Sequence, residues 1–185
     1  MKILIVSHPR SGTGFAAMCL QDIGIKVGHE SLMENGISSW LWAADCYTNA
    51  RWGDNYQDIK PDLTVLLARD AEDVIASMAF TAARALDWMR QWVQIPDGDS
   101  PYVCAHSLVR WIELCQKNRK PDFIVRTKDF PDFCEWAFGQ RPSENLRGYN
   151  ARPHKPLSAR SLKKAAPLIS EYNELIKNYW RKSNN

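Results

Sequence analysis

The chain has 185 residues, of which 45% are hydrophobic and 24% charged, and its formal net charge at pH 7 is +3. A chain of this length predicts one domain, residues 1–185, with a sizeable core. Lys and Arg are scattered apart from modest clusters near residues 117–120 and at the C-terminus, so no nucleic-acid partner is indicated. An anionic small ligand is compatible with this charge.

The cysteines and the hydropathy pattern bear on the compartment. An odd number of cysteines without CxxC spacing predicts neither a disulfide framework nor a zinc site, so we expect reduced, buried thiols. No stretch approaches the roughly 20 apolar residues of a membrane span, and the apolar start is too short for a signal peptide. We therefore expect a cytoplasmic protein without a membrane partner. The cysteines are Cys19, Cys46, Cys104, Cys115 and Cys134.

Residues 2–28 follow the order strand, turn, helix, strand. Residues 2–6 (KILIV) form a β-branched and leucine run that is typical of a strand buried on both faces of a parallel sheet. Residues 13–23 carry apolar side chains at helical spacing and end at Gly24, and residues 25–28 resemble a second short strand. Such units favour parallel strands joined by right-handed crossovers.

The same alternation continues downstream and indicates an α/β fold. The predicted elements are a strand at 63–67, a helix at 71–85, a helix at 100–117 and a strand at 123–126. Ser100 is suited to cap the second of these helices, with Pro101 at its first position. Residues 161–180 have helical periodicity, and we expect Pro167 to break that helix or to begin another.

Residues 37–56 are dense in aromatic side chains, and their period favours neither helix nor strand. The preferred interpretation is that they pack over the sheet as core; the alternative is that they wall a pocket where aromatic faces stack on a substrate. The aromatic residues are Trp40, Trp42, Tyr47, Trp52 and Tyr56.

The turn after the first strand has the composition of an anion site. A loop that leaves a parallel strand and enters a helix directs unpaired N–H groups outward, where the helix dipole adds positive potential. Small residues let the backbone wrap around tetrahedral oxygens, hydroxyls add donors, and arginine adds a fork of donors. The turn consists of Arg10, Ser11, Gly12, Thr13 and Gly14. It lacks the glycine spacing and the lysine of a nucleoside triphosphate P-loop.

A second pair of polar residues is expected at the same edge of the sheet. Arg69 ends the strand predicted at 63–67, and Ser77 follows in the next helix. Ligands of open α/β sheets bind at this edge, so Arg69 and Ser77 are candidates to hold a second phosphate. The alternative for Arg69 is a solvated ion pair with Asp70.

These motifs together resemble the sulfotransferase family, nearest to its bacterial-type and tyrosylprotein-like members. The motifs are PRSGTG at 9–14, GHE at 28–30, R-x-x-x-D-V-x-x-S at 69–77 and IVRTKDF at 124–130, so the likeness spans roughly the first 130 residues. The resemblance implies a single sulfotransferase-like domain with an α/β, three-layer, P-loop-like fold and a mostly parallel central sheet flanked by helices. It also implies transfer of a sulfuryl group from 3′-phosphoadenosine 5′-phosphosulfate to a small-molecule, sugar or peptide acceptor, leaving 3′-phosphoadenosine 5′-phosphate.

The resemblance also assigns site residues. Arg10, Ser11, Gly12, Thr13 and Gly14 would hold the sulfate and 5′-phosphate, and Arg69 and Ser77 the 3′-phosphate. The chain departs from the family at Gly14, where a second threonine is usual, at Ala71 and Glu72, which replace a proline and a basic residue, and in lacking R-K-G-x-x-G-D-W. Residues 152–158 (RPHKPLS) are the late basic stretch that would close over the nucleotide, unless they form a solvated loop.

The proposed reaction requires a base and an electrostatic partner for the leaving group. Arg10 and the loop amides would stabilise the charge on the leaving phosphate oxygen, and we expect no metal. Glu30 is the predicted general base, as the resemblance to the tyrosylprotein-like members implies, if burial raises its pKa. His29 is the rival. Strand alternation predicts that the two side chains point to opposite faces.

Two other functions fit parts of the sequence. One is a nucleotide-binding module without turnover, which would bind partners through a tryptophan-rich surface. The other is an atypical P-loop small-molecule kinase, which the missing P-loop lysine disfavours.

Overall fold

The computed structural model describes residues 1–44, 60–81, 83–146 and 155–180. It shows an α/β protein with an all-parallel sheet of five strands in the order β2-β3-β1-β4-β5. The strands are β1 (Ile3–Ser7), β2 (Val27–His29), β3 (Gly36–Ser38), β4 (Leu63–Ala68) and β5 (Phe123–Arg126). The predicted fold class is therefore confirmed, and the sheet is parallel throughout.

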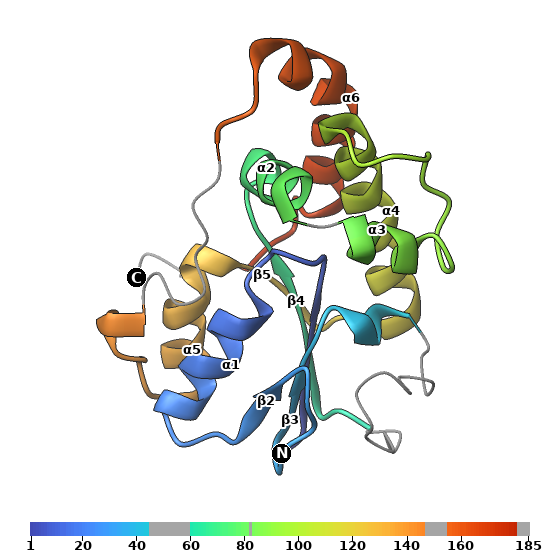
Figure 1. Ribbon diagram of the computed structural model, residues 1–185. Helices are drawn as coiled ribbons and strands as arrows, with labels where there is room; N and C mark the ends of the chain where they lie inside the picture. The colour runs from blue at the N-terminus through green and yellow to red at the C-terminus, as the bar shows by residue number, and fades with distance from the viewer. Residues whose placement is uncertain (45–59, 82, 147–154, 181–185) are drawn as a thin grey trace.

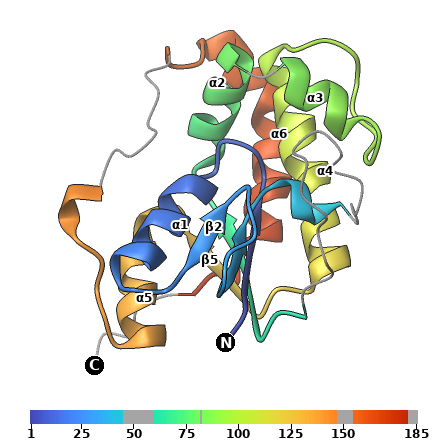
Figure 2. The same ribbon diagram turned by 60° about the horizontal axis from the view of Figure 1, so that its bottom comes forward.

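Helices cover both faces of the sheet, which gives three layers (Figures 1 and 2). Alternate residues of the central strand point to opposite faces. Ile3 and Ile5 pack with α1 (Thr13–Asp22) and α5 (Phe130–Phe138), whereas Leu4 and Val6 belong to the larger cluster on the other face. That cluster draws on α2 (Ala71–Thr81), α3 (Ala83–Met89), α4 (Pro101–Arg119) and α6 (Ala159–Leu175). Every residue of β1 is buried, as the run KILIV predicts.

Most predicted elements are found within a few residues of their expected bounds. In α4, Ser100 caps the helix by accepting a hydrogen bond from the Val103 N–H, with Pro101 at the first position, as expected. The helix predicted at 71–85 is divided into α2 and α3. Strand β3 was not predicted, because three residues that include a glycine and a serine carry too little periodicity to indicate a strand.

The prediction that Pro167 breaks the last helix is wrong. Helix α6 runs through Pro167 without interruption. Pro167 and Lys163, the residue whose carbonyl loses its helical partner, are both exposed, while Ala165, Leu168 and Tyr172 face the core. Because the missing hydrogen bond lies on the solvent side, water can satisfy the carbonyl and the buried stripe keeps the helix together. Among the described residues, no helix is both long and apolar enough to cross a membrane.

The strand order places a topological switch point at the centre of the sheet. From β1 the chain enters α1 on one face, and from β4 it enters α2 on the other, although β1 and β4 are neighbours. The loops that follow the two strands therefore diverge at the carboxyl ends of β1 and β4. Open α/β sheets bind ligands at such positions.

Candidate functional site

The loop between β1 and α1 is shaped by two residues in the left-handed region of backbone space. Arg10 has a φ of 71° and Gly12 a φ of 98°. Left-handed geometry is costly for arginine and inexpensive for glycine, so the turn at Arg10 is held by its surroundings. Gly12 occupies the N-cap position of α1 and has no side chain with which to cap the first N–H groups. The positive end of the helix dipole thus lies at the carboxyl-end edge of the sheet.

Ser11 carries a buried hydroxyl whose hydrogen-bonding capacity is unused. The residue is 1% exposed, and its Oγ has no hydrogen-bond partner among the described residues. An unsatisfied buried hydroxyl costs about 1–3 kcal/mol, which an oxygen of a bound anion would recover. The loop therefore has the features of a site for a tetrahedral anion such as phosphate.

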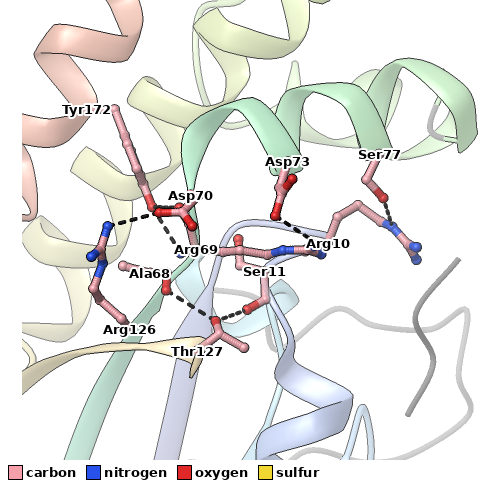
Figure 3. Close-up of polar contacts among 10 residues, drawn as sticks. All are labelled: Arg10, Ser11, Ala68, Arg69, Asp70, Asp73, Ser77, Arg126, Thr127 and Tyr172. Atoms are coloured by element: carbon pink, nitrogen blue, oxygen red, sulfur yellow. Dashed lines mark hydrogen bonds and ion pairs between the residues drawn. The ribbon is translucent and has the colours of Figure 1, made fainter. Parts of the chain in front are cut away.

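Thr127 ties this loop to the end of β4 and was missed as a site residue. Its hydroxyl lies 2.6 Å from the Ser11 carbonyl oxygen and 3.1 Å from that of Ala68, as Figure 3 shows. A Cβ built on Gly12 would lie 2.6 Å from Thr127 Cγ2, so a side chain there would have to displace Thr127. The motif IVRTKDF contained the threonine, but its spacing from the loop could not show that the two meet.

The structure brings Arg69 and Ser77 into contact with the first loop. Arg69 Nη1 donates to the Arg10 carbonyl oxygen at 3.3 Å, and Arg10 Nε donates to Ser77 Oγ at 2.9 Å (Figure 3). Arg69 also pairs with Asp73 at 3.3 Å, whereas Asp70 pairs with Arg126 at 2.9 Å. The alternative prediction, an Arg69–Asp70 ion pair, is therefore wrong. Ser77 contacts Arg10, whereas we expected it to lie beside Arg69.

Glu30 and His29 follow a geometry that strand alternation did not predict. Glu30 lies just beyond β2 with a φ of 56°, and its Oε1 is 3.5 Å from His29 Nε2. The prediction that the two side chains point to opposite faces is wrong, because the left-handed turn at Glu30 ends the alternation. The carboxylate also accepts hydrogen bonds from the Ser39 hydroxyl and the Trp40 N–H.

The surroundings of Glu30 make it basic enough for proton transfer near neutral pH. Burial raises the pKa of Glu30 to about 7, and the Ser39 and Trp40 hydrogen bonds only partly oppose this. Burial lowers the pKa of His29 below its ordinary value, so His29 is predominantly neutral at pH 7. A carboxyl group with a pKa near the working pH meets the requirement for a general base.

His29 also joins Glu30 to the loop and fills the space left by Gly14. Its Nε2 lies 3.3 Å from Thr13 Oγ1, and a Cβ built on Gly14 would lie 3.3 Å from its Cε1. The sulfotransferase pattern that the loop resembles usually has a threonine at position 14. Glycine stands here because the imidazole of His29 occupies the room that a side chain would need.

The aromatic segment is described only in its first part. Trp42 is buried in the core, and Trp40 packs beside it with its ring centroid 5.1 Å from that of Trp88 and 5.8 Å from that of Trp111. The core interpretation is confirmed for these two tryptophans. Tyr47, Trp52 and Tyr56 lie outside the described residues, as do residues 152–154 of the late basic stretch.

The described ranges hold no group of three or more His, Cys, Asp or Glu side chains arranged to bind a metal ion. Comparisons of the chain with models of known protein families, with curated proteins and with solved structures gave no significant match.

Proposed function

We propose that this protein is a sulfotransferase that uses 3′-phosphoadenosine 5′-phosphosulfate and an acceptor hydroxyl or amine. One observation carries the proposal: the hydrogen bond from Arg69 to the Arg10 carbonyl joins the two phosphate motifs of the sequence at the switch point of the sheet. The two residues are 59 positions apart in the sequence. β1 and β4 are neighbours in the sheet, so one ligand with two separate anionic groups would reach both loops.

The residues present fit such a cofactor. The N–H groups at the start of α1, with Ser11 Oγ and Thr13 Oγ1, would hold the 5′-phosphosulfate, which suits the unused hydroxyl of Ser11. Arg69 and Ser77 would hold the 3′-phosphate, with Arg10 between the two groups. Surface pairing of Arg69 with Asp73 is weak because both side chains are partly exposed, so a phosphate can displace it.

The chemistry assigns separate tasks to Glu30 and Arg10. The bound cofactor supplies an activated sulfuryl group. Glu30 would take the proton from the acceptor hydroxyl when the acceptor attacks sulfur and the phosphate leaves. Arg10 and the loop amides would stabilise the negative charge on the leaving phosphate. His29 Nε2 lies 3.5 Å from Glu30 Oε1 and 3.3 Å from Thr13 Oγ1, so the imidazole stands between Glu30 and the loop.

The test is calorimetric titration of 3′-phosphoadenosine 5′-phosphate into the wild type, Arg69→Ala and Arg141→Ala, with magnesium ATP as competitor. Arg141 is a matched control because its ion pairs are with Asp132 and Glu135 of α5 and not with residues of the two loops. We expect micromolar binding that is lost in Arg69→Ala and kept in Arg141→Ala. Absence of binding, or preference for magnesium ATP, would contradict the proposal and favour the kinase.

Turnover separates an enzyme from a binding module. Formation of 3′-phosphoadenosine 5′-phosphate is followed with phenolic, sugar and peptide acceptors. Glu30→Gln is expected to bind nucleotide within about twofold of the wild type and to lose turnover by roughly 100-fold or more, because the base is removed. Wild-type binding without turnover on any acceptor would favour the nucleotide-binding module.

A further inference from the structure

Helix α6 supplies a side chain that holds the backbone of Arg69. Tyr172 is 1% exposed, and its hydroxyl accepts a hydrogen bond from the Arg69 N–H at 3.2 Å. The same hydroxyl donates to the Arg69 carbonyl oxygen at 2.8 Å (Figure 3). One phenol thus satisfies both backbone polar groups of a single residue, from 103 positions further along the chain.

The position of Arg69 explains why this help is needed. Strand β4 ends at Ala68, so the backbone groups of Arg69 lie just beyond the hydrogen bonds of the sheet. Backbone groups in a partly buried turn need partners from elsewhere. Burial also raises the pKa of the Tyr172 hydroxyl, so it keeps the proton that it donates to Arg69.

The residues on either side of Arg69 are held by other elements. The Ala68 carbonyl accepts from Thr127, and the Asp70 carboxylate pairs with Arg126 at 2.9 Å. These contacts fix the residues before and after Arg69. Of the contacts drawn in Figure 3, those of Tyr172 are the ones that reach the backbone of Arg69 itself. The guanidinium of Arg69 then extends to the Arg10 carbonyl in the β1–α1 loop.

We propose that Tyr172 is a positioning residue that sets the preference of the site for a nucleotide with a 3′-phosphate, by holding the Arg69 backbone so that its guanidinium faces the loop. This inference rests on the proposed function. A tyrosine that served only the core would fill the same volume, but its hydroxyl would have no influence on which nucleotide binds.

The experiment measures the ratio of two dissociation constants, for adenosine 5′-monophosphate and for 3′-phosphoadenosine 5′-phosphate. These probes differ only in the 3′-phosphate, so the ratio reports its recognition. The variants are Tyr172→Phe, which keeps the ring, and Leu168→Ala, which weakens the packing of the same helix without touching Arg69. Thermal unfolding of each variant is measured in parallel.

We expect Tyr172→Phe to lower the ratio by roughly five- to tenfold, the equivalent of about one lost hydrogen bond, with little change in the affinity for adenosine 5′-monophosphate. Leu168→Ala should lower the unfolding temperature and keep the wild-type ratio. If Tyr172→Phe leaves the ratio unchanged, or loses affinity equally for both probes, the inference is overturned. The proposed function still stands in that case if the wild type prefers 3′-phosphoadenosine 5′-phosphate. A wild type that binds neither probe overturns both.

Amide hydrogen exchange of the wild type gives a test that does not depend on a variant folding. If Tyr172 holds the Arg69 N–H, that amide exchanges at least tenfold more slowly than in an unstructured peptide. Exchange at the unstructured rate would show that the contact does not persist, and the inference would fail.

Discussion

Glu30 is buried at a position that disfavours its ionised form. Its side chain is 19% exposed, and burial raises its pKa to about 7 from an ordinary value of 4.5. The folded protein therefore binds the Glu30 proton more tightly than the unfolded chain does. Between pH 4.5 and 7 the unfolded chain loses this proton first, so ionisation of Glu30 lowers the free energy of unfolding as the pH rises.

We predict that Glu30→Gln stabilises the protein above pH 7, by on the order of 2–3 kcal/mol, and that the gain disappears as the pH falls toward 4.5. Urea unfolding between pH 4.5 and 8 measures it. Glu34→Gln is the control, because the pKa of exposed Glu34 is lowered by Lys26 and its neutralisation should bring no gain at high pH. A Glu30→Gln variant that is no more stable than the wild type at pH 8 would show that Glu30 is not destabilised by burial.

The β1–α1 loop depends on one glycine for two separate reasons. Gly12 has a φ of 98°, which side chains rarely adopt, and its missing Cβ leaves room for Thr127. Gly24, which follows the other end of α1, has a φ of 81°, and apart from its neighbours in the chain no described residue has an atom within 4 Å of the position of its Cβ. Substitution of Gly24 therefore tests backbone strain alone, whereas substitution of Gly12 tests backbone strain together with a steric clash.

Gly24→Ala is expected to lower the free energy of unfolding by about 1 kcal/mol, the cost of left-handed geometry alone. Gly12→Ala should lower it by at least about 2 kcal/mol, since it adds the clash with Thr127, and it should also weaken nucleotide binding. Thermal denaturation with titration of 3′-phosphoadenosine 5′-phosphate measures both effects. Equal destabilisation by the two variants would mean that Thr127 moves aside at little cost.

At the scale of the whole molecule, four buried cysteines are divided between the two faces of the sheet. Cys19 and Cys134 belong to the cluster under α1 and α5, and Cys104 and Cys115 to the cluster under α4. All four are buried free thiols, as the sequence predicts, and burial raises the pKa of Cys19 and Cys104 to about 12. Their thiolates are scarce in the folded protein, so they react slowly with alkylating reagents.

We predict that iodoacetamide labels these four thiols only on global unfolding, and at the same denaturant concentration on both faces, if residues 1–185 form one cooperative domain. Mass spectrometry of protein pulse-labelled along a urea series gives the midpoint for each cysteine. Labelling of one face well before the other would show that the layers unfold independently and that the prediction of a single domain is wrong.

Much of the fold could be predicted because it depends on local signals. The apolar run of β1 and the Ser100–Pro101 start of α4 each reflect chemistry within a few residues, and both were found as expected. The same local logic failed at Pro167, because packing of α6 outweighs the lost hydrogen bond. It failed again at Glu30, because a left-handed residue just after β2 ends the alternation of side chains along that strand.

The sequence by itself determined the α/β class and the residue types of the candidate anion site, because periodicity and loop composition are properties of short segments. Only the tertiary structure decided that Arg10 meets Ser77, that Thr127 and Tyr172 hold the two loops, and that Glu30 is buried beside His29. Those contacts join positions that are far apart in the sequence, and they form because strand order and helix packing bring these positions together. Burial decides the pKa of Glu30 for the same reason, since desolvation depends on everything packed around a group.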